Sequence, residues 1–221
     1  MSAGFFFVAL VVVVGGGYLW KQMRQKAEVE GMLVAARALG WYCSETPTID
    51  VEQLWFPLLR RGHDRKPRCF VWGALDGRPA TIFQHSFAEG SGKNERTYTF
   101  SCALLEMPCH ARQLEITSKS VFRKFGEALG IGDAAFESEA FNDRYHVACE
   151  DQPFAFALLD PAMQQFLVEA PPTEVIATAG RYLFIAVDRI DTKRFTQLAG
   201  FGQAVYRQIP DVVFDNYGGP R

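Results

Sequence analysis

The hydrophobic pattern of the chain begins with an apolar stretch that carries no charged side chain, AGFFFVALVVVVGGGYLW at residues 3–20. Eighteen helical residues would span about 27 Å, close to the ~30 Å hydrocarbon core of a bilayer. Tyr18 and Trp20 stand where an aromatic belt would lie. The pattern therefore predicts a single N-terminal transmembrane helix, with residues 1–20 as the anchor.

A second helix is predicted directly after the anchor, at residues 21–40, because apolar residues recur there at spacings near three and four. Gly40 is a suitable stop for this juxtamembrane helix. Its expected apolar stripe consists of Met23, Ala27, Met32, Leu33, Ala36 and Leu39.

The middle of the chain has the shorter period of β-strands. Strands are predicted at residues 70–75, 80–87, 96–105 and 113–118. Asp76-Gly77 separates the first two strands as a hairpin turn, and residues 89–94 form the next turn. A short helix should follow Ser120, which is a good N-cap residue.

The last third is predicted to alternate between strands and helices. Residues 144–150 and 154–159 are expected to be extended, and Asp160-Pro161 should cap and start a helix. Residues 173–178 and 182–188 should pair as a hairpin around Ala179-Gly180, with YLFIAV central in the sheet because it is apolar on both faces. A last helix begins near Thr192 and stops at Pro210, and residues 215–221 form a flexible tail.

Together these elements predict an α+β domain over residues 41–214, built as an antiparallel sheet with helices packed on one face. A curved or barrel-like sheet remains an open alternative. The first twenty residues precede this domain as its membrane anchor.

Charge adds an orientation to this organisation. Lys21, Arg24 and Lys26 follow the apolar stretch and no basic residue precedes it, so the N-terminus should face outward and the domain should be cytoplasmic. The rival readings are a buried helix and a cleaved signal peptide, but a signal peptide would carry its basic residues before the apolar stretch. The net charge of -2 gives no reason to expect a nucleic-acid partner. Five cysteines, an odd number without a CxxC pair, favour a reducing compartment.

The strongest candidate binding segment is LRRGHDRKPRCF at residues 59–70, where one acidic residue accompanies a run of basic ones. The simpler interpretation is a solvated loop. The alternative is a patch that contacts anionic lipid of the membrane or an unknown protein partner, since each basic residue near a membrane surface contributes about 1 kcal/mol. The residues concerned are Arg60, Arg61, Arg65, Lys66 and Arg68.

Side chains capable of catalysis or metal binding are present, but their spacing does not match a catalytic site. His146 and Cys149 are three positions apart on a predicted strand and so point to opposite faces. Cys102, Cys109 and His110 match no zinc spacing. GSGKN at residues 90–94 lacks the glycine and the hydroxyl residue of a phosphate-binding loop. We therefore expect no catalytic residue, no metal and no cofactor.

One segment resembles a known group of proteins. Residues 137–167 contain Glu137-Ser138, Phe141-Asn142, Tyr145 and Val147, followed by Asp151, Ala155, Leu158-Leu159, Pro161 and Met163. This spacing is similar to that of uncharacterised bacterial membrane-associated proteins that share a domain of unknown function. The resemblance implies a compact α+β domain on a membrane anchor and implies no reaction or cofactor.

Three functions are compatible with these features. The first is a non-catalytic binding or scaffold module at the membrane. The second is a membrane-tethered hydrolase that uses a thiol, with Cys109-His110 as the candidate pair, or a site assembled across the sheet. The third is a subunit of a larger membrane complex.

Overall fold

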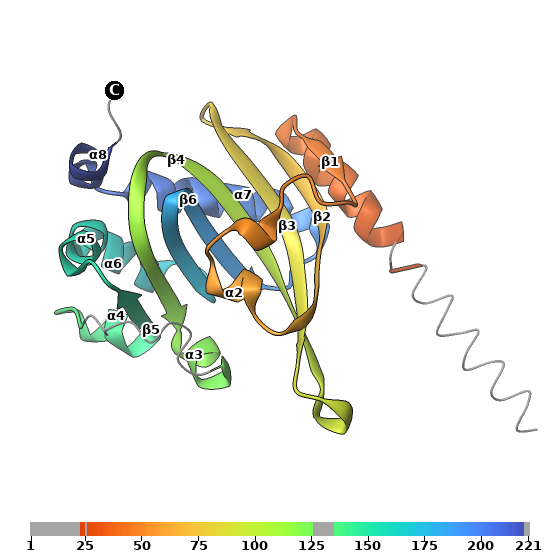
Figure 1. The fold of residues 1–221 in the computed structure, drawn as a ribbon. Coiled ribbons are helices and arrows are strands. Elements are labelled where there is room, and N and C mark those ends of the chain that lie inside the picture. The colour runs from red at the N-terminus through yellow and green to blue at the C-terminus, as the bar shows by residue number, and fades with distance from the viewer. Residues whose placement is uncertain (1–22, 25, 126–134, 219–221) are drawn as a thin grey trace, which may run out of the picture.

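The structure is a computed structural model that describes residues 23–24, 26–125 and 135–218 (Figure 1). The predicted anchor, the first two residues of the predicted juxtamembrane helix and the last three residues of the predicted tail lie outside this range. Within the described residues, no helix has the length and apolar character needed to cross a bilayer.

The sheet is antiparallel, as the sequence predicted, and six strands belong to it in the described part of the chain. Neighbouring strands follow the order β1-β2-β3-β4-β5, and β6 pairs with β4 on its other side. The turn at Asp76-Gly77 joins β2 to β3, and both of its residues have positive φ, as the predicted hairpin turn requires. The strands are β1 (Tyr42–Ser44), β2 (His63–Leu75), β3 (Arg78–Glu89), β4 (Arg96–Ser118), β5 (Tyr145–Cys149) and β6 (Val175–Asp188).

The two longest partners, β4 and β6, give the sheet its curvature (Figure 1). The predicted strands at 96–105 and 113–118 are one strand, β4, which runs on through residues 106–112. The N-terminal part of β4 pairs with β3 and its C-terminal part pairs with β5. The chain is so strongly curved that the two ends of β6 come together. The amide of Glu174, the residue before β6, donates a hydrogen bond to the carbonyl of Ala186 near the C-terminal end of β6, at 2.9 Å.

The predicted hairpin at Ala179-Gly180 is wrong, because β6 passes through these residues without reversing. Gly180 has a φ of 56° and lies opposite Ala111 at a shift of register between β4 and β6. The glycine therefore forms an irregularity in the curved pair, where positive φ is available to it. Among the described strands β6 pairs with β4 alone, so YLFIAV is not central; it is apolar on both faces because each face of the curved sheet is covered.

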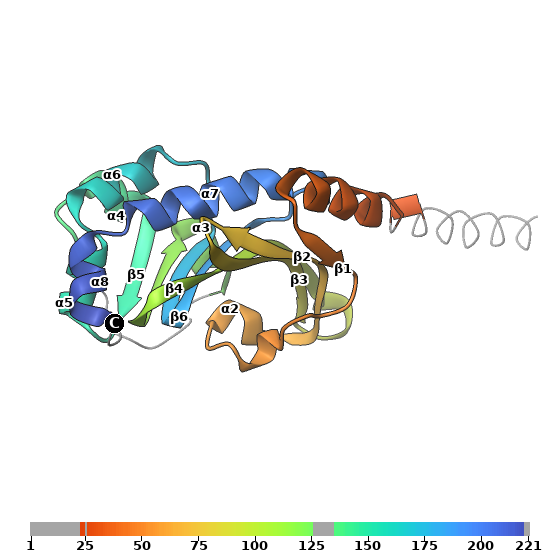
Figure 2. The same cartoon turned by 90° about the horizontal axis from the view of Figure 1, so that it is seen from above.

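Helices cover one face of the sheet more heavily than the other (Figure 2). The heavily covered face carries the helix at residues 26–39 together with α7, and its core includes side chains from α4, α5, α6 and α8. The opposite face is lined by phenylalanine rings and is covered by η1, α2 and α3, so the helices do not all pack on one face as predicted. The helices are η1 (Val51–Gln53), α2 (Pro57–Arg60), η2 (Gly92–Asn94), α3 (Lys119–Phe125), α4 (Glu139–Arg144), α5 (Gln152–Leu158), α6 (Pro161–Glu169), η3 (Thr192–Arg194), α7 (Phe195–Gln208) and α8 (Asp211–Tyr217).

Residues 154–159 were expected to be extended, but most of them belong to α5. The Asp151 carboxylate accepts a hydrogen bond from the Phe154 amide at 2.9 Å and so caps the helix. Phe154, Ala155 and Leu158 are buried, which is the spacing of a helix rather than of a strand. The helix predicted at Asp160-Pro161 is confirmed as α6, with Asp160 as its N-cap.

The C-terminal region is more ordered than predicted. The helix expected from Thr192 begins as η3, continues as α7 and stops before Pro210, as expected. Residues 215–217, assigned to the flexible tail, are part of α8. Val213 of α8 is buried in the core on the heavily covered face, which explains why this segment is folded.

Candidate functional site

The helix at residues 26–39 follows the predicted anchor and packs directly on the sheet. Met32, Ala35 and Ala36 are buried in the larger core, with 2%, 0% and 4% of their surfaces exposed. Met23 and Leu33 are exposed although both belong to the predicted apolar stripe. The buried stripe is therefore narrower than expected and is made mainly of small side chains, so the helix backbone lies close to the domain.

The closest approach occurs at Gly31. A Cβ atom at this position would lie 2.0 Å from Oγ1 of Thr192 and 3.0 Å from the backbone nitrogen of Lys193. The Thr192 hydroxyl donates a hydrogen bond to the Glu28 carbonyl oxygen at 2.8 Å. Glycine at residue 31 thus lets the helix contact η3 through backbone and hydroxyl groups.

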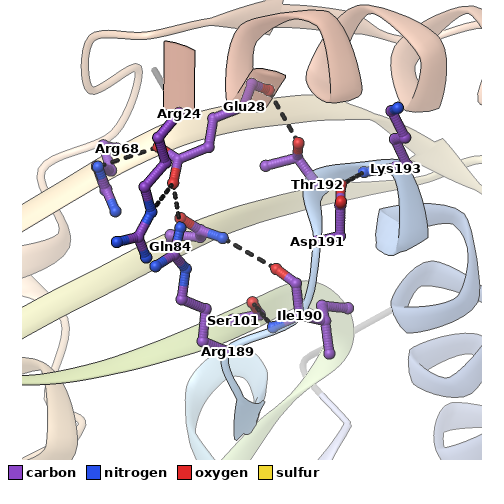
Figure 3. A network of polar contacts seen from close by, with 10 residues as sticks. All are labelled: Arg24, Glu28, Arg68, Gln84, Ser101, Arg189, Ile190, Asp191, Thr192 and Lys193. Carbon is purple, nitrogen blue, oxygen red and sulfur yellow. Dashed lines mark hydrogen bonds and ion pairs between the residues drawn. The ribbon is translucent and has the colours of Figure 1, made fainter. Parts of the chain in front are cut away.

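Glu28 is the centre of a polar network between this helix and the sheet (Figure 3). Its carboxylate forms ion pairs with Arg68 of β2 at 3.1 Å and with Arg189, which follows β6. Arg24 of the preceding helical turn is 3.7 Å away. The Glu28 side chain is only 11% exposed, so these pairs lie in a partly desolvated setting where they are stronger than exposed pairs.

The turn that carries Arg189 is held by hydrogen bonds with two buried polar side chains of the sheet. The Gln84 amide nitrogen donates to the Ile190 carbonyl at 3.1 Å, and the Ile190 amide donates to the Ser101 hydroxyl at 3.1 Å (Figure 3). Gln84 and Ser101 are both fully buried. The side-chain nitrogen of Gln84 must face the Ile190 carbonyl to donate this hydrogen bond, so the side-chain oxygen of Gln84 points away from that carbonyl. This Gln84 oxygen has no hydrogen-bond partner within the described residues.

A cavity of about 280 Å³ opens beside this network. Two arginines and two carboxylates line it: Arg24, Arg189, Glu28 and Asp191. Gln84 and Thr192 complete its polar lining. The lining is therefore balanced in charge and offers both hydrogen-bond donors and acceptors. We call these six residues the anchor-side pocket, because the predicted anchor precedes the helix that forms one of its walls.

The C-terminal end of the same helix is fixed by Trp41. The ring lies against Gly73 of β2, where a Cβ would be 2.3 Å from the ring atom Cδ1. The indole nitrogen donates to the Ala74 carbonyl at 3.1 Å. The helix is therefore held at both ends as well as along its buried face.

The basic segment at residues 59–70 is not the loop that the sequence indicated. It contains the end of α2 and the first residues of β2, and Asp64 and Cys69 adopt positive φ angles of 51° and 58°. Both residues lie where the register between β2 and β3 shifts. The sequence pattern failed here because such irregularities interrupt the alternation of a regular strand.

The structure divides the five basic residues between different environments. Arg61 donates to Glu89 at 2.5 Å, and Arg65 lies 3.3 Å from Glu52. Arg68 belongs to the Glu28 network on the other face of the sheet.

The two remaining basic residues are more open to a partner. The Arg60 guanidinium lies 4.7 Å above the ring of Trp55, which is 68% exposed. Lys66 is exposed. The run in the sequence therefore does not form one uniform basic patch.

The cysteines occupy positions that do not favour a nucleophilic thiolate. Cys149 is buried on β5, where its thiol lies within hydrogen-bond distance of the Asp151 and Gln113 carbonyls, and burial raises its pKa. Burial also raises the pKa of Cys109, and His110 is exposed as its neighbour along β4. In the described part of the chain, no group of three or more histidine, cysteine or acidic side chains is placed to hold a metal ion.

The Glu28 network was not predicted from the sequence. Arg24 and Glu28 stand four residues apart on one helix, which is a detectable ion-pair spacing. Their partners Arg68 and Arg189 lie in distant parts of the chain, and only the folded sheet brings them together.

Comparison with known proteins gives one informative result. No protein-family model matches the chain, and no curated protein matches it. The fold is similar to the crystal structure of the mycobacterial trehalose monomycolate transport factor A, with a TM-score of 0.59 and 11% sequence identity. The similarity covers 88% of this chain and 99% of the other chain. At this level of identity the likeness shows a shared fold and nothing about shared residues.

Proposed function

We propose that this chain is a single-pass membrane protein whose cytoplasmic domain is a non-catalytic binding or scaffold module. In this proposal residues 1–20 cross the bilayer with the N-terminus outside. The helix at residues 26–39 then connects the membrane to the sheet. The basic residues Arg60 and Lys66 supply part of a surface for anionic lipid or for a protein partner.

The observation that carries this proposal is the close packing of the helix at residues 26–39. A flexible tether would need no buried contacts with the domain that it holds. Here Gly31 touches η3, and Glu28 is joined to the sheet by two arginines. Such a connection would hold the sheet at a fixed orientation to the membrane, which is useful to a scaffold that must present one surface to a partner.

The proposal is tested by locating the full chain in cells. A C-terminal reporter that is active only in the cytoplasm should report activity, and the protein should stay in the membrane fraction after an alkaline carbonate wash. Replacing two apolar residues of the stretch by arginine, Val11→Arg with Val13→Arg, should release the protein into the soluble fraction, while Val11→Leu with Val13→Leu should not. Recovery of the unmodified chain in the soluble fraction would contradict the proposal.

A second candidate is a subunit of a larger membrane complex. Its support is the exposure of two large aromatic side chains, Tyr42 of β1 at 71% and Trp55, which precedes α2, at 68%. The similar structure is that of a transport factor, so an accessory role in a membrane transport process is one form that this function would take. Crosslinking in intact cells should capture a partner at Trp55 in the wild-type protein and lose it in Trp55→Ser.

A further inference from the structure

We infer that the anchor-side pocket binds the headgroup of a membrane phospholipid that carries both a phosphate and a primary ammonium group, such as phosphatidylethanolamine. This inference rests on the proposed membrane location. It concerns a site that is separate from the basic residues at 60–68 that face solvent.

The arginines provide the phosphate side of the pocket. Arg24 and Arg189 line the cavity, and the ion pair of Arg189 with Glu28 uses one of the five N–H donors that a guanidinium carries. Two arginines therefore line this side of the cavity, and phosphate oxygens are the acceptors that arginine recognises best.

The acceptors provide the ammonium side. The buried Gln84 oxygen lacks a donor within the described chain, and the Ile190 carbonyl prevents the amide from turning to exchange its two ends. The exposed carboxylate of Asp191 lines the same cavity and uses one oxygen to accept the Lys193 amide at 2.9 Å. A primary ammonium supplies three N–H donors to such acceptors, whereas the trimethylammonium of phosphatidylcholine supplies none.

Charge balance favours a zwitterion over a simple anion. Two arginines and two carboxylates line the cavity, so a zwitterionic headgroup can place its phosphate against the arginines and its ammonium against the carboxylates, whereas an anionic headgroup has no cationic group to place there. The cavity of about 280 Å³ is at the small end of ligand sites, which suits a headgroup whose acyl chains stay in the bilayer.

The position in the chain brings the pocket to the membrane surface. Arg24 is four residues beyond the proposed span, and four residues reach at most about 14 Å. The headgroup layer lies within this distance of the hydrocarbon core. A lipid of the cytoplasmic leaflet could therefore insert its headgroup without leaving the bilayer.

The experiment uses the full chain in detergent, mixed with equal amounts of phosphatidylethanolamine, phosphatidylglycerol and phosphatidylcholine that have identical acyl chains. Native mass spectrometry counts the bound lipids. We expect phosphatidylethanolamine to be about tenfold enriched over each of the other two, the effect of roughly one charge-assisted hydrogen bond. Arg24→Gln and Asp191→Asn should each reduce the enrichment severalfold, and Asp191→Asn keeps a side chain that can still cap η3.

The matched control is the ion pair of Arg207 and Asp76 at the β2–β3 turn, which is separated by 2.8 Å and also exposed. Arg207→Gln and Asp76→Asn make the same charge changes and should leave the enrichment intact. Equal binding of the three lipids, a preference for phosphatidylglycerol, or the same loss in the control variants would each overturn the inference.

A soluble ligand is separated from a lipid by a further arm. Soluble phosphoethanolamine should displace the bound lipid only at millimolar concentration. Displacement at micromolar concentration would show that the pocket serves a soluble phosphate ester and would overturn the lipid assignment. Failure of the proposed function is distinguishable, because it appears as loss of the chain from the membrane fraction and not as a change in lipid preference.

Discussion

Gly31→Ala is the sharpest perturbation of the contact between the helix at residues 26–39 and the domain. The new methyl group would lie 2.0 Å from the Thr192 hydroxyl oxygen, and Thr192 is 1% exposed, so its side chain has little room to move. Overpacking of this kind costs about 1–3 kcal/mol. Loss of the Thr192–Glu28 hydrogen bond, with a buried hydroxyl left unpaired, costs about 1–3 kcal/mol more. The higher helix propensity of alanine returns about 1 kcal/mol.

The expected net effect is a loss of about 1–5 kcal/mol in the free energy of unfolding, measured by urea denaturation of the full chain in detergent. Gly200→Ala is the matched control, since Gly200 lies in α7 and a Cβ added there would meet no atom within 4 Å. The control should be neutral or stabilise the protein by up to about 1 kcal/mol. Adding Thr192→Ala removes the clashing oxygen, so the double variant should be less destabilised than the sum of the two single variants. If Gly31→Ala behaves like Gly200→Ala, the helix does not pack on η3 as described.

Three further predictions concern buried titratable groups. Burial lowers the pKa of His85 to about 4 from an unfolded value of 6.5, so the unfolded chain takes up this proton first as the pH falls. The free energy of unfolding should therefore decrease by about 3 kcal/mol between pH 6.5 and pH 4. His85→Leu, compared with the wild type by urea denaturation across this range, should lose that part of the pH dependence, and an unchanged slope would show that His85 is not responsible. Burial raises the pKa of Glu115, so the contribution of this carboxyl group to the free energy of unfolding is present at low pH and is lost as the pH rises above 4.5. Glu115→Gln keeps an acceptor for the Thr117 hydroxyl, so it should stabilise the protein at pH 7 and have no effect at pH 3. A stabilisation at pH 3 that is absent at pH 7 would refute the assignment. Burial raises the pKa of Cys69 to about 11 and also raises that of Cys102, so a thiol-reactive probe at pH 7.5 should label neither cysteine until the chain is unfolded. Fast labelling of either cysteine in the folded protein would contradict this and would favour the hypothesis of a thiol-dependent hydrolase.

Local patterns predicted those parts of the fold that local chemistry determines. The β2–β3 hairpin follows from Asp76-Gly77, because its turn needs two residues that tolerate positive φ. The start of α6 follows from Asp160-Pro161 for a similar reason, since the carboxylate caps the Met163 amide. In both cases a few adjacent residues suffice.

Other elements depend on packing between distant segments, and the sequence pattern gave the wrong answer there. Phe154, Phe156 and Leu158 alternate as a strand would, yet capping by Asp151 and burial of Ala155 select a helix. Gly180 looked like a hairpin turn, but its role is set by Ala111 on a strand more than sixty residues earlier.

The candidate site shows the same division. The pair of Arg24 and Glu28 is visible in one helix, but the anchor-side pocket exists only because Arg189 and Gln84 are brought to it by two different strands. The basic run at 60–68 is conspicuous in the sequence, and yet Arg61 and Arg68 already have acidic partners in the folded chain. A run of basic residues in the sequence therefore does not show which of them can contact a partner. That depends on which of them already form ion pairs in the folded chain.

Hydrogen exchange on the full chain in lipid nanodiscs tests the central claim most directly. If the helix at residues 26–39 is held by Gly31, Glu28 and Trp41, its amides should exchange as slowly as those of β4 and should become faster in Glu28→Ala while β4 is unchanged. Fast exchange of residues 26–39 in the wild-type protein, with β4 still protected, would show that the helix is not held against the sheet and would contradict the proposed fixed connection between membrane and sheet.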